Sequence, residues 1–249
     1  KEAADLGCLT VRFTGGEPLL RQDFATLYEF TRRLGIRVQL FTNARLITLE
    51  LANLFVTIPP MEKIEVSVYG MNEESYAANS LAPAGFKSYT AGLQLLLDHN
   101  IPFVVKSVLL PANQHELEAF ESYANNLPWS EGNPMVTMFY DLRNRRDDLQ
   151  KNRQIASLRI PPEEGVSYLL RHEAEWQVYK NSYRNLVPPI DGSRLFQCSA
   201  GKNQLCIDAY GQVQACMGLR APELVCIAGT SLSEALDFFK QLPEIRTDN

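Results

Sequence analysis

Thr14-Gly15-Gly16-Glu17-Pro18-Leu19-Leu20 directly follows a short apolar run, residues 9–13, that has the pattern of a β-strand. Two adjacent glycines allow a backbone to approach a ligand without obstruction by side chains. Glu17 supplies an anionic acceptor for an ammonium group, and Pro18 fixes the turn. A tight turn from strand to helix, without any ligand, is the alternative interpretation of the same residues.

The chain outward from this turn alternates short β-branched or apolar runs with longer amphipathic stretches. We predict strands at residues 9–13, 37–41, 63–68, 103–109 and 135–140, and helices at residues 23–34, 49–55, 88–99 and 114–126. Parallel strands need crossover helices between them, so the alternation predicts an α/β fold with a parallel sheet. These strands, with one further βα unit before Lys1, would form an open (β/α)6 barrel.

The C-terminal part has a different composition and is expected to form a separate small domain. Residues 141–154 have the composition of a polar, arginine-rich linker, and Pro161-Pro162-Glu163-Glu164 is typical of a helix start. Residues 196–216 have the pattern of a β-hairpin that turns near Tyr210-Gly211. We therefore predict a partial barrel at residues 1–160, a helical bridge at 161–190 and a small cysteine-containing hairpin and helix domain at 191–249.

The 249 residues have the composition of an ordinary globular protein, with 45% hydrophobic and 21% charged residues. The formal net charge of -5 provides no overall positive field, which disfavours a nucleic-acid partner. No run of about 18 apolar residues is present to span a bilayer, and the first residues do not resemble a signal peptide. We therefore expect a cytoplasmic protein that binds neither nucleic acid nor membrane.

Small or polar residues also lie at the ends of the other predicted strands. The sequence has Thr42-Asn43-Ala44 after the second strand, Ser67-Val68-Tyr69-Gly70 at the third and Lys106-Ser107 at the fourth. Ligands of parallel α/β folds collect at the C-terminal ends of the strands. We expect these residues to share one rim with Glu17, although a single serine or asparagine satisfies backbone groups about as often as it contacts a ligand.

Residues 6–126 resemble the radical S-adenosylmethionine (SAM) enzymes. The resemblance rests on T-G-G-E-P-L-L at residues 14–20, T-N-A in place of T-N-G, S-V-Y-G in place of S-L-D-G, residues 92–97 and Asn113. It implies a partial radical SAM barrel in which residues 14–18 bind the methionyl amino group of SAM, with Glu17 accepting from it. The SAM pocket would then be lined by Thr14, Gly15, Gly16, Glu17, Pro18, Asn43, Ser67, Tyr69, Lys106 and Ser107.

The family's C-x-x-x-C-x-x-C motif, which binds the SAM-cleaving [4Fe-4S] cluster through three thiolates, is absent from this sequence. The motif normally precedes the G-G-E-P strand by one helix, which is where this chain begins. We therefore expect the ligands of that cluster to lie outside the chain. Cys8 stands alone before the first strand and is expected to be a buried, unreactive thiol.

Four of the five cysteines lie in the last quarter of the chain. In a cytosolic protein this favours metal ligation over disulfides, and the hairpin can bring Cys198 and Cys216 together. By themselves, these two thiols fit zinc, an iron-sulfur cluster or a buried thiol pair. The spacing from Cys198 through Gly211 to Cys216 resembles the opening half of a SPASM domain, which implies an auxiliary [4Fe-4S] cluster with both cysteines as ligands. Cys206 is a further candidate ligand or a core residue, and Cys226 is expected in the core.

The resemblance implies reductive cleavage of SAM to methionine and a 5'-deoxyadenosyl radical, which abstracts hydrogen from a substrate inside the barrel. The SPASM-like tail favours a ribosomally made precursor peptide or a target protein as substrate, modified by crosslinking or side-chain oxidation. Flavodoxin or ferredoxin is the implied reducing partner. The alternatives are maturation of a porphyrin or another small cofactor by the same chemistry, a non-catalytic peptide-binding scaffold, and a zinc-stabilised α/β domain without SAM chemistry.

Overall fold

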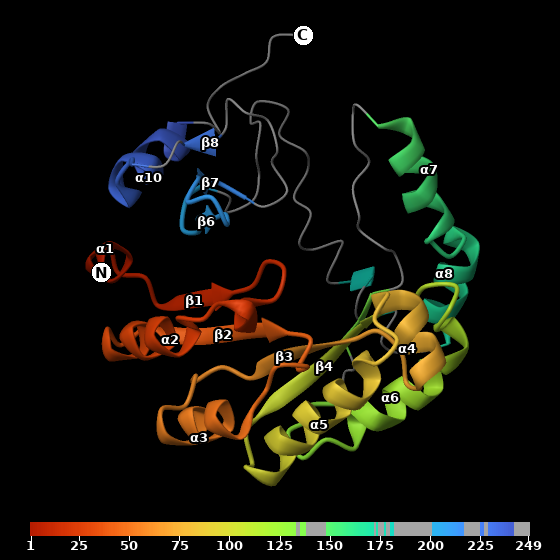
Figure 1. Ribbon diagram of the computed structural model, residues 1–249. Helices are drawn as coiled ribbons and strands as arrows, with labels where there is room; N and C mark the ends of the chain where they lie inside the picture. The colour runs from red at the N-terminus through yellow and green to blue at the C-terminus, as the bar shows by residue number, and fades with distance from the viewer. Residues whose placement is uncertain are drawn as a thin grey trace, which may run out of the picture. The chain divides into compact units, whose positions relative to one another are not determined.

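The computed structural model describes residues 1–132, 135–137, 148–171, 173, 177, 180–181, 201–216, 225–226 and 229–241. The chain divides into two compact units: residues 9–176, here called the larger unit, and residues 1–8 with 177–249, the smaller unit (Figure 1). The division falls inside the stretch 161–190 that the sequence predicts as a bridge. Within the described ranges, every helix falls short of the length or apolar character that a membrane crossing requires.

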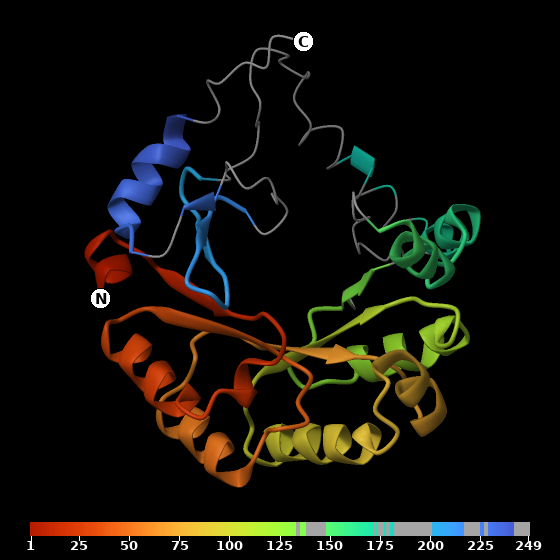
Figure 2. The ribbon, with the colours of Figure 1, turned by 45° about the horizontal axis from the view of Figure 1, so that its top comes forward.

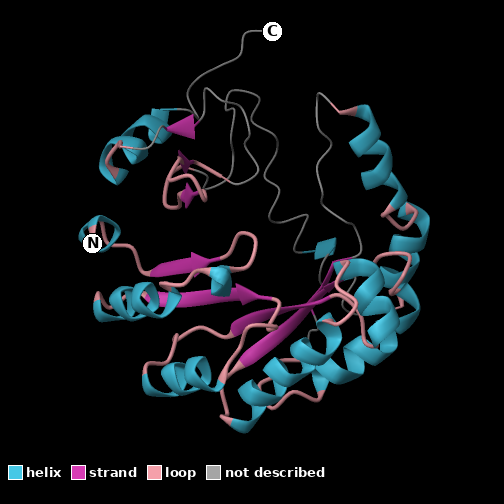
Figure 3. Ribbon diagram, in the orientation of Figure 1, coloured by secondary structure: helices cyan, strands magenta, loops and turns pink. Residues whose placement is uncertain are grey.

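The larger unit contains a parallel sheet in which each strand pairs with the next strand along the chain. Its strands are β1 (Thr10–Phe13), β2 (Arg37–Thr42), β3 (Ile64–Val68), β4 (Phe103–Val108) and β5 (Met135–Thr137). Its helices are η1 (Pro18–Leu20), α2 (Phe24–Arg33), α3 (Leu49–Thr57), α4 (Glu73–Ser80), α5 (Gly85–Asp98), η2 (Gln114–Glu116), α6 (Leu117–Asn125), α7 (Leu149–Ser157) and α8 (Pro162–Leu170). The predicted α/β fold with a parallel sheet is confirmed (Figure 3).

Helices α2 to α6 lie on one face of the curved sheet (Figure 2). Strand residues that face these helices, such as Leu40, Val66 and Val105, are buried. The residues that alternate with them, such as Gln39 and Glu65, point to the other face and are only half-buried. Parallel sheets covered by helices on both faces have nearly continuous apolar strands instead. The polar second face therefore corresponds to the inner side of an open barrel, and we call it the inner face.

Two helices differ from the sequence-based prediction. Helix α4 is not predicted, because E-E-S-Y-A-A-N-S has little apolar periodicity; it begins where Asn72 Oδ1 accepts from the backbone N–H groups of Glu74 and Ser75, at 2.9 and 3.0 Å. Helix α7 overlaps the predicted linker 141–154, so that prediction is wrong from residue 149 onward. Asp148 caps α7 by accepting from the backbone N–H of Lys151 at 2.8 Å. In both cases a side-chain cap, rather than a broad apolar face, starts the helix.

The smaller unit contains α1 (Glu2–Asp5), an antiparallel sheet of β6 (Cys206–Ile207), β7 (Val213–Gln214) and β8 (Val225–Cys226), and α10 (Leu232–Gln241). Asp208 Oδ1 shapes the turn between β6 and β7, because it accepts from the backbone N–H groups of Tyr210 and Gln212, both at 2.9 Å. The predicted hairpin is confirmed for residues 206–214, including its turn near Tyr210-Gly211, whereas residues 196–200 of the prediction lie outside the described residues. A small apolar core joins the sheet to α10 and consists of Val213, Ala215, Ala235 and Phe239.

Two fully buried tyrosines of the larger unit differ in whether their hydroxyl groups have partners. Tyr28 donates to the carbonyl oxygen of Ile58, whereas the Tyr76 hydroxyl has no hydrogen-bond partner among the described residues. A buried unpaired hydroxyl costs about 1–3 kcal/mol, and a paired one contributes about 1 kcal/mol. We expect Tyr28→Phe to lower the free energy of unfolding by about 1 kcal/mol, and Tyr76→Phe to leave it unchanged or raise it. Urea unfolding followed by circular dichroism measures both, and equal losses would contradict this difference.

Burial raises the pKa of Tyr28, raises that of Tyr76 to about 12, and raises that of Tyr89 well above its ordinary value. An unfolded tyrosine ionises near pH 10, so the unfolded chain releases protons there while the folded chain keeps them. Raising the pH above about 10 therefore favours unfolding, by up to about 1.4 kcal/mol per pH unit for each such tyrosine. The free energy of unfolding should fall less steeply with rising pH in Tyr76→Phe. A free energy of unfolding that stays constant from about pH 8 to pH 11 would contradict this prediction.

Candidate functional site

Glu17 occupies the turn between β1 and η1 and has a fixed carboxylate. Its Oε1 accepts from the backbone N–H of Leu19 at 3.1 Å, which caps η1, and from Thr42 Oγ1 at 2.9 Å. Its Oε2 accepts from the backbone N–H of Asn43 at 2.8 Å. The carboxylate therefore ties the end of β1 to the end of β2, and the two strand ends meet at one rim.

One acceptor position of this carboxylate remains open. An ionised carboxylate has about four acceptor positions, and Glu17 uses three of them within the protein. No arginine, lysine or histidine among the described residues forms a salt bridge with it. Its negative charge and its remaining acceptor position are therefore free for a cationic donor, such as the ammonium group of a ligand.

The turn before Glu17 has an open backbone. A Cβ atom added at Gly15 or Gly16 would meet no heavy atom within 4 Å, so packing does not require either glycine. Gly15 has a φ of +110°, which residues with a side chain rarely adopt. Thr14 is exposed, and Pro18 is buried at the first position of η1. The geometry thus fits the predicted approach of a ligand to the backbone of residues 14–16.

Three other predicted pocket residues divide between the two faces of the sheet. Ser67 and Lys106 are register partners in β3 and β4, and both are half-buried on the inner face. Ser107 is buried on the helix-covered face, where its Oγ donates to the carbonyl oxygen of Val68 at 3.1 Å. The structure therefore brings Ser67 and Lys106 together and places Ser107 apart from them.

Asn43 and Tyr69 lie at strand ends and already have partners. Asn43 Oδ1 accepts from the backbone N–H of Arg45 at 3.0 Å, and the Tyr69 ring packs edge-on against Tyr76 with centroids 5.6 Å apart. Ala44 has a φ of 60° and is fully buried. The left-handed conformation of Ala44 gives a physical reason for the glycine in the commoner T-N-G motif. The rim segment after β2, residues 43–45, is thus held in one conformation by the hydrogen bond from Arg45 to Asn43 and by the burial of Ala44.

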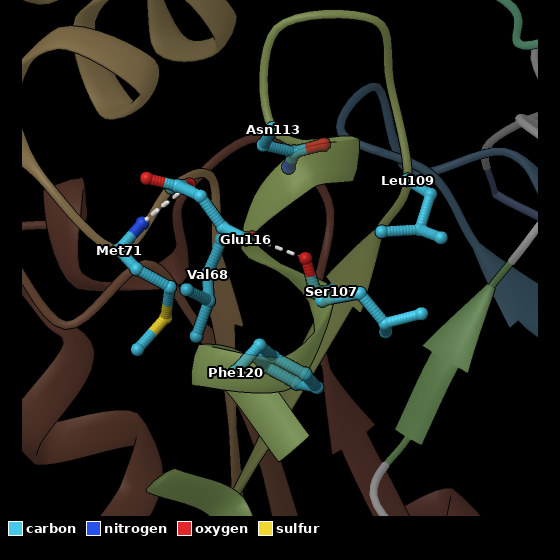
Figure 4. Close-up of a pocket in the computed structure, with 9 residues that line it drawn as sticks. Val68, Met71, Ser107, Leu109, Asn113, Glu116 and Phe120 are labelled. Carbon is cyan, nitrogen blue, oxygen red and sulfur yellow. Dashed lines mark hydrogen bonds between the residues drawn. The ribbon is translucent and has the colours of Figure 1, made fainter. Parts of the chain in front are cut away.

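A buried carboxylate that sequence reasoning missed, Glu116, holds the loop after β3. Its Oε2 accepts from the backbone N–H of Met71 at 2.9 Å (Figure 4). Its Oε1 accepts from Ser75 Oγ at 2.9 Å and from Asn72 Nδ2. In the sequence, Glu116 looks like an ordinary exposed acid near a helix start, and only contacts across more than forty positions reveal its role.

Asn113 reinforces the same connection. Its Nδ2 donates to the carbonyl oxygens of Tyr69 and Val108, at 3.2 and 3.1 Å, and its Oδ1 accepts from the backbone N–H of Leu110 at 2.8 Å. These contacts enclose a small, mostly apolar pocket lined by Val68, Gly70, Met71, Ser107, Leu109, Asn113, Glu116, Leu117 and Phe120 (Figure 4). Because its polar side chains are bonded within the protein, the pocket supports the rim rather than offering a ligand site.

Glu116→Gln is expected to lower the free energy of unfolding by about 2 kcal/mol, because the new amide N–H2 would face donors where the carboxylate accepts. Glu118→Gln is the matched control. Glu118 is exposed and pairs with Arg171 at the surface, with 3.6 Å between the charged atoms. Removing this salt bridge should lower the free energy of unfolding by less than about 0.5 kcal/mol. Urea unfolding compares the two, and equal effects would contradict a bridging role for Glu116.

The predicted metal ligands are only partly within the described chain. Cys206 begins β6 and Cys216 follows β7, and both are half-buried. Cys198 and the side chain of Cys226 lie outside the described residues, so the pairing of Cys198 with Cys216 stays a prediction. Across the described ranges, no three His, Cys, Asp or Glu residues are placed to hold a metal ion. Cys8 is half-buried, not the fully buried thiol expected.

Comparison with known proteins places this rim in a family. Residues 1–124, about half of the chain, match the Radical SAM superfamily. The AdoMet-dependent heme synthase of Methanosarcina barkeri is 28% identical over 116 residues, which are 47% of this chain and 33% of that protein. The antilisterial bacteriocin subtilosin biosynthesis protein AlbA of Bacillus subtilis is 23% identical over 222 residues, 87% of this chain and 47% of that protein. The chain therefore spans between 33% and 47% of the length of these two relatives.

Solved structures of anSMEcpe have a similar fold. The native protein with bound AdoMet gives a TM-score of 0.62 at 16% identity, covering 95% of this chain and 68% of that chain. The complex with AdoMet and the Cp18Cys peptide gives a TM-score of 0.61 at 15% identity, covering 99% and 74%. At these identities the likeness shows the fold alone. Together with the family match and the G-G-E-P rim, it leads to the conclusion that this chain belongs to the radical SAM superfamily.

Proposed function

We propose that this chain is the SAM-binding core of an enzyme that generates a 5'-deoxyadenosyl radical and uses it to modify a peptide or protein, by crosslinking or side-chain oxidation. The observation that carries the proposal is the Glu17 carboxylate. It is fixed by three hydrogen bonds, has no salt-bridge partner among the described residues and keeps a free acceptor position next to two open glycines. The α-ammonium group of SAM is a cationic donor that fits this position.

Each rim residue has a role in this proposal. Glu17 accepts from the methionyl ammonium group, and the open backbone of Gly15 and Gly16 lets the methionine approach. Ser67 and Lys106 line the pocket on the inner face. The [4Fe-4S] cluster, whose C-x-x-x-C-x-x-C ligands are not in this sequence, supplies the electron that cleaves SAM when bound. The task of these residues is to hold SAM in one orientation and to exclude water.

Two similarities support a peptide substrate. AlbA, which matches along 87% of this chain, is a bacteriocin biosynthesis protein. Structures with a similar fold include complexes with bound peptides. We further propose that Cys198 and Cys216 hold an auxiliary [4Fe-4S] cluster, with Cys206 as a third candidate ligand, because thiolates are the usual ligands of such clusters. Flavodoxin or ferredoxin would supply the electrons, in the cytoplasm.

Maturation of a porphyrin or another small cofactor is the second candidate function. It is favoured by the heme synthase of Methanosarcina barkeri, which at 28% is more similar in sequence than AlbA, although over 47% of this chain. A second heme synthase, from Nitratidesulfovibrio vulgaris, is 27% identical over 46% of this chain. The longer match to AlbA is the reason for preferring the peptide.

Mass spectrometry of products separates the two functions. The full-length protein is reconstituted anaerobically with iron and sulfide and incubated with SAM, dithionite and either the peptides encoded beside its gene or coproporphyrin III. We expect a peptide to lose hydrogen atoms in a SAM-dependent reaction while the porphyrin stays unchanged. Reactions without dithionite are the control. A modified porphyrin with unmodified peptides would reverse the assignment.

A further inference from the structure

Helices α2 to α6 leave the inner face of the sheet uncovered (Figure 2). Polar side chains of neighbouring strands are linked across this face. Arg12, Gln39, Glu65 and Lys106 come from four neighbouring strands, β1 to β4, and the cations of Arg12 and Lys106 both lie over the ring of Phe41. We call these five residues the inner-face cluster. The interior of a closed eight-stranded barrel is filled by apolar side chains, whereas the inner face of this open sheet is polar. A linked row of charged and amide groups there therefore needs a functional or structural explanation.

Arg12 is held in one orientation while its outer nitrogens stay free. Its Nε donates to Gln39 Oε1 at 2.7 Å, and its guanidinium carbon lies 4.8 Å from the centre of the Phe41 ring. Among the described residues, no acceptor is bonded to either Nη atom. A guanidinium group binds a carboxylate through two parallel N–H donors. Arg12 thus presents a prearranged pair of donors to whatever occupies the inner face.

Gln39 and Glu65 fix this orientation. Gln39 Nε2 donates to Glu65 Oε1 at 2.7 Å, so the amide oxygen of Gln39 is the end that faces Arg12. The Glu65 side chain is only 12% exposed, and its Oε2 lies 3.9 Å from Lys106 Nζ without a hydrogen-bond partner among the described residues. Burial raises the pKa of Glu65, and the charges of Lys106 and Arg12 oppose that rise. Glu65 therefore fixes Gln39 by a hydrogen bond and interacts with Arg12 through its charge, without a hydrogen bond or salt bridge to it among the described residues.

The cluster has surplus positive charge at Arg12. It contains two cations and one carboxylate, and Lys106 is the cation close to that carboxylate. Arg12 has only neutral contacts, the amide of Gln39 and the ring of Phe41. Arg12 is exposed, so its charge is accessible to a ligand on this face. An anionic group is therefore the complement of this part of the inner face.

We propose that Arg12 binds a carboxylate side chain, Asp or Glu, of the peptide substrate and so helps to select it. The proposal rests on the peptide-modifying function proposed above. SAM is proposed at the rim, between the turn at Glu17 and the last inner-face residues of β3 and β4, Ser67 and Lys106, whereas Arg12 lies farther back within β1. Side chains on one face of a strand recur every second residue, so Arg12 is one layer, about 7 Å, farther from the rim than Thr14. That position suits a substrate lying across the inner face next to SAM.

Two blocked peptide libraries test this proposal. Both have four random neutral residues on each side of a central residue, which is Glu in one library and Gln in the other, so that they differ by a single carboxylate. Equilibrium dialysis against the full-length, cluster-loaded protein with SAM, followed by mass spectrometry, measures the ratio of bound Glu peptides to bound Gln peptides. We expect the wild type to favour Glu peptides about tenfold, the effect of one charge-assisted pair.

Variants locate this preference. Arg12→Gln should abolish it, and Arg12→Lys should retain only part, because an ammonium group lacks the paired donors. Gln39→Leu should lower the preference several-fold by releasing Arg12, whereas a purely structural role of Gln39 would change only the melting temperature. Arg33→Gln, in which a surface arginine paired with Glu29 is lost, is the matched control and should keep the preference. If Arg12→Gln does not fold, the Lys and Gln39 variants decide the test.

Equal binding of both libraries by the wild type would overturn the proposal, as would a preference that persists in Arg12→Gln. The carboxylate bound by Arg12 could instead be that of SAM itself. Comparing the binding of SAM with that of decarboxylated SAM distinguishes this source from the peptide. If Arg12→Gln weakens binding of SAM but not of decarboxylated SAM, the bound anion is that of SAM and the proposal is wrong. Failure of the proposed function is read separately, as the absence of 5'-deoxyadenosine from the wild-type protein.

Discussion

Glu17→Ala is expected to lower the affinity for SAM by about a hundredfold, and the formation of 5'-deoxyadenosine with it. The substitution removes the free acceptor for an ammonium group and the charge that attracts it. It also removes the cap of η1 and the link to the end of β2. A hydrogen bond to a charged group contributes about 1.5–3 kcal/mol, which sets the size of the effect. Equilibrium dialysis of SAM against the full-length, cluster-loaded protein measures it.

Two further variants separate binding from support of the rim. Thr42→Val removes one hydrogen bond to Glu17 but keeps the carboxylate, so the affinity should fall less than about tenfold. Glu17→Gln keeps a carbonyl oxygen without the charge, so its affinity for SAM should lie between those of Thr42→Val and Glu17→Ala. Wild-type affinity in Glu17→Ala would show that SAM binds elsewhere. Equal losses of SAM affinity in Thr42→Val and Glu17→Ala would show that Glu17 has only a structural role.

Gly92→Ala is expected to lower the free energy of unfolding by about 3 kcal/mol, although alanine is the better helix former by about 1 kcal/mol. A Cβ atom at position 92 would lie 1.9 Å from the carbonyl oxygen of Ala44, which is backbone and cannot rotate away. Helix α5 would have to move from the rim segment, or Ala44 would have to leave its left-handed conformation. Urea unfolding followed by circular dichroism measures the loss.

Thr90→Ala is the control for this substitution. Thr90 is exposed in the same helix and bonds only to the carbonyl oxygen of Lys87, so its replacement should change the free energy of unfolding by less than about 0.5 kcal/mol. Because the clash falls next to Asn43, Gly92→Ala should also weaken SAM binding. A Gly92→Ala protein as stable as the wild type would contradict the close packing of α5 against Ala44.

The parallel sheet could be predicted from the sequence because the patterns that indicate its strands and helices each lie within a short stretch of the chain. Apolar residues such as Val38 and Val66 alternate with polar ones, and an amphipathic helix follows each of the first strands. The T-G-G-E-P turn is local as well, since Glu17 caps the helix that begins at the next residue. Helix α4 shows the limit of such local patterns, because its start depends on one asparagine cap and its sequence has little apolar periodicity.

The parts of the site that could not be predicted depend on contacts between distant segments. Glu116 bonds to the loop after β3 across more than forty positions, and no local pattern indicates that. Ser107 was expected beside Lys106 at the rim, yet adjacent strand residues point to opposite faces, so only Lys106 reaches the inner face. The bonds from Arg12 to Gln39 and from Gln39 to Glu65 join three strands and follow from register, which the sequence does not specify.

We propose that the rim around Glu17 holds SAM for reductive cleavage. The most direct test is to reconstitute the full-length protein anaerobically with iron and sulfide, reduce it with dithionite and quantify 5'-deoxyadenosine by liquid chromatography. We expect 5'-deoxyadenosine and methionine in equal amounts from the wild type, and a much smaller yield from Glu17→Ala. A wild-type protein that carries its cluster and forms no 5'-deoxyadenosine would contradict the claim.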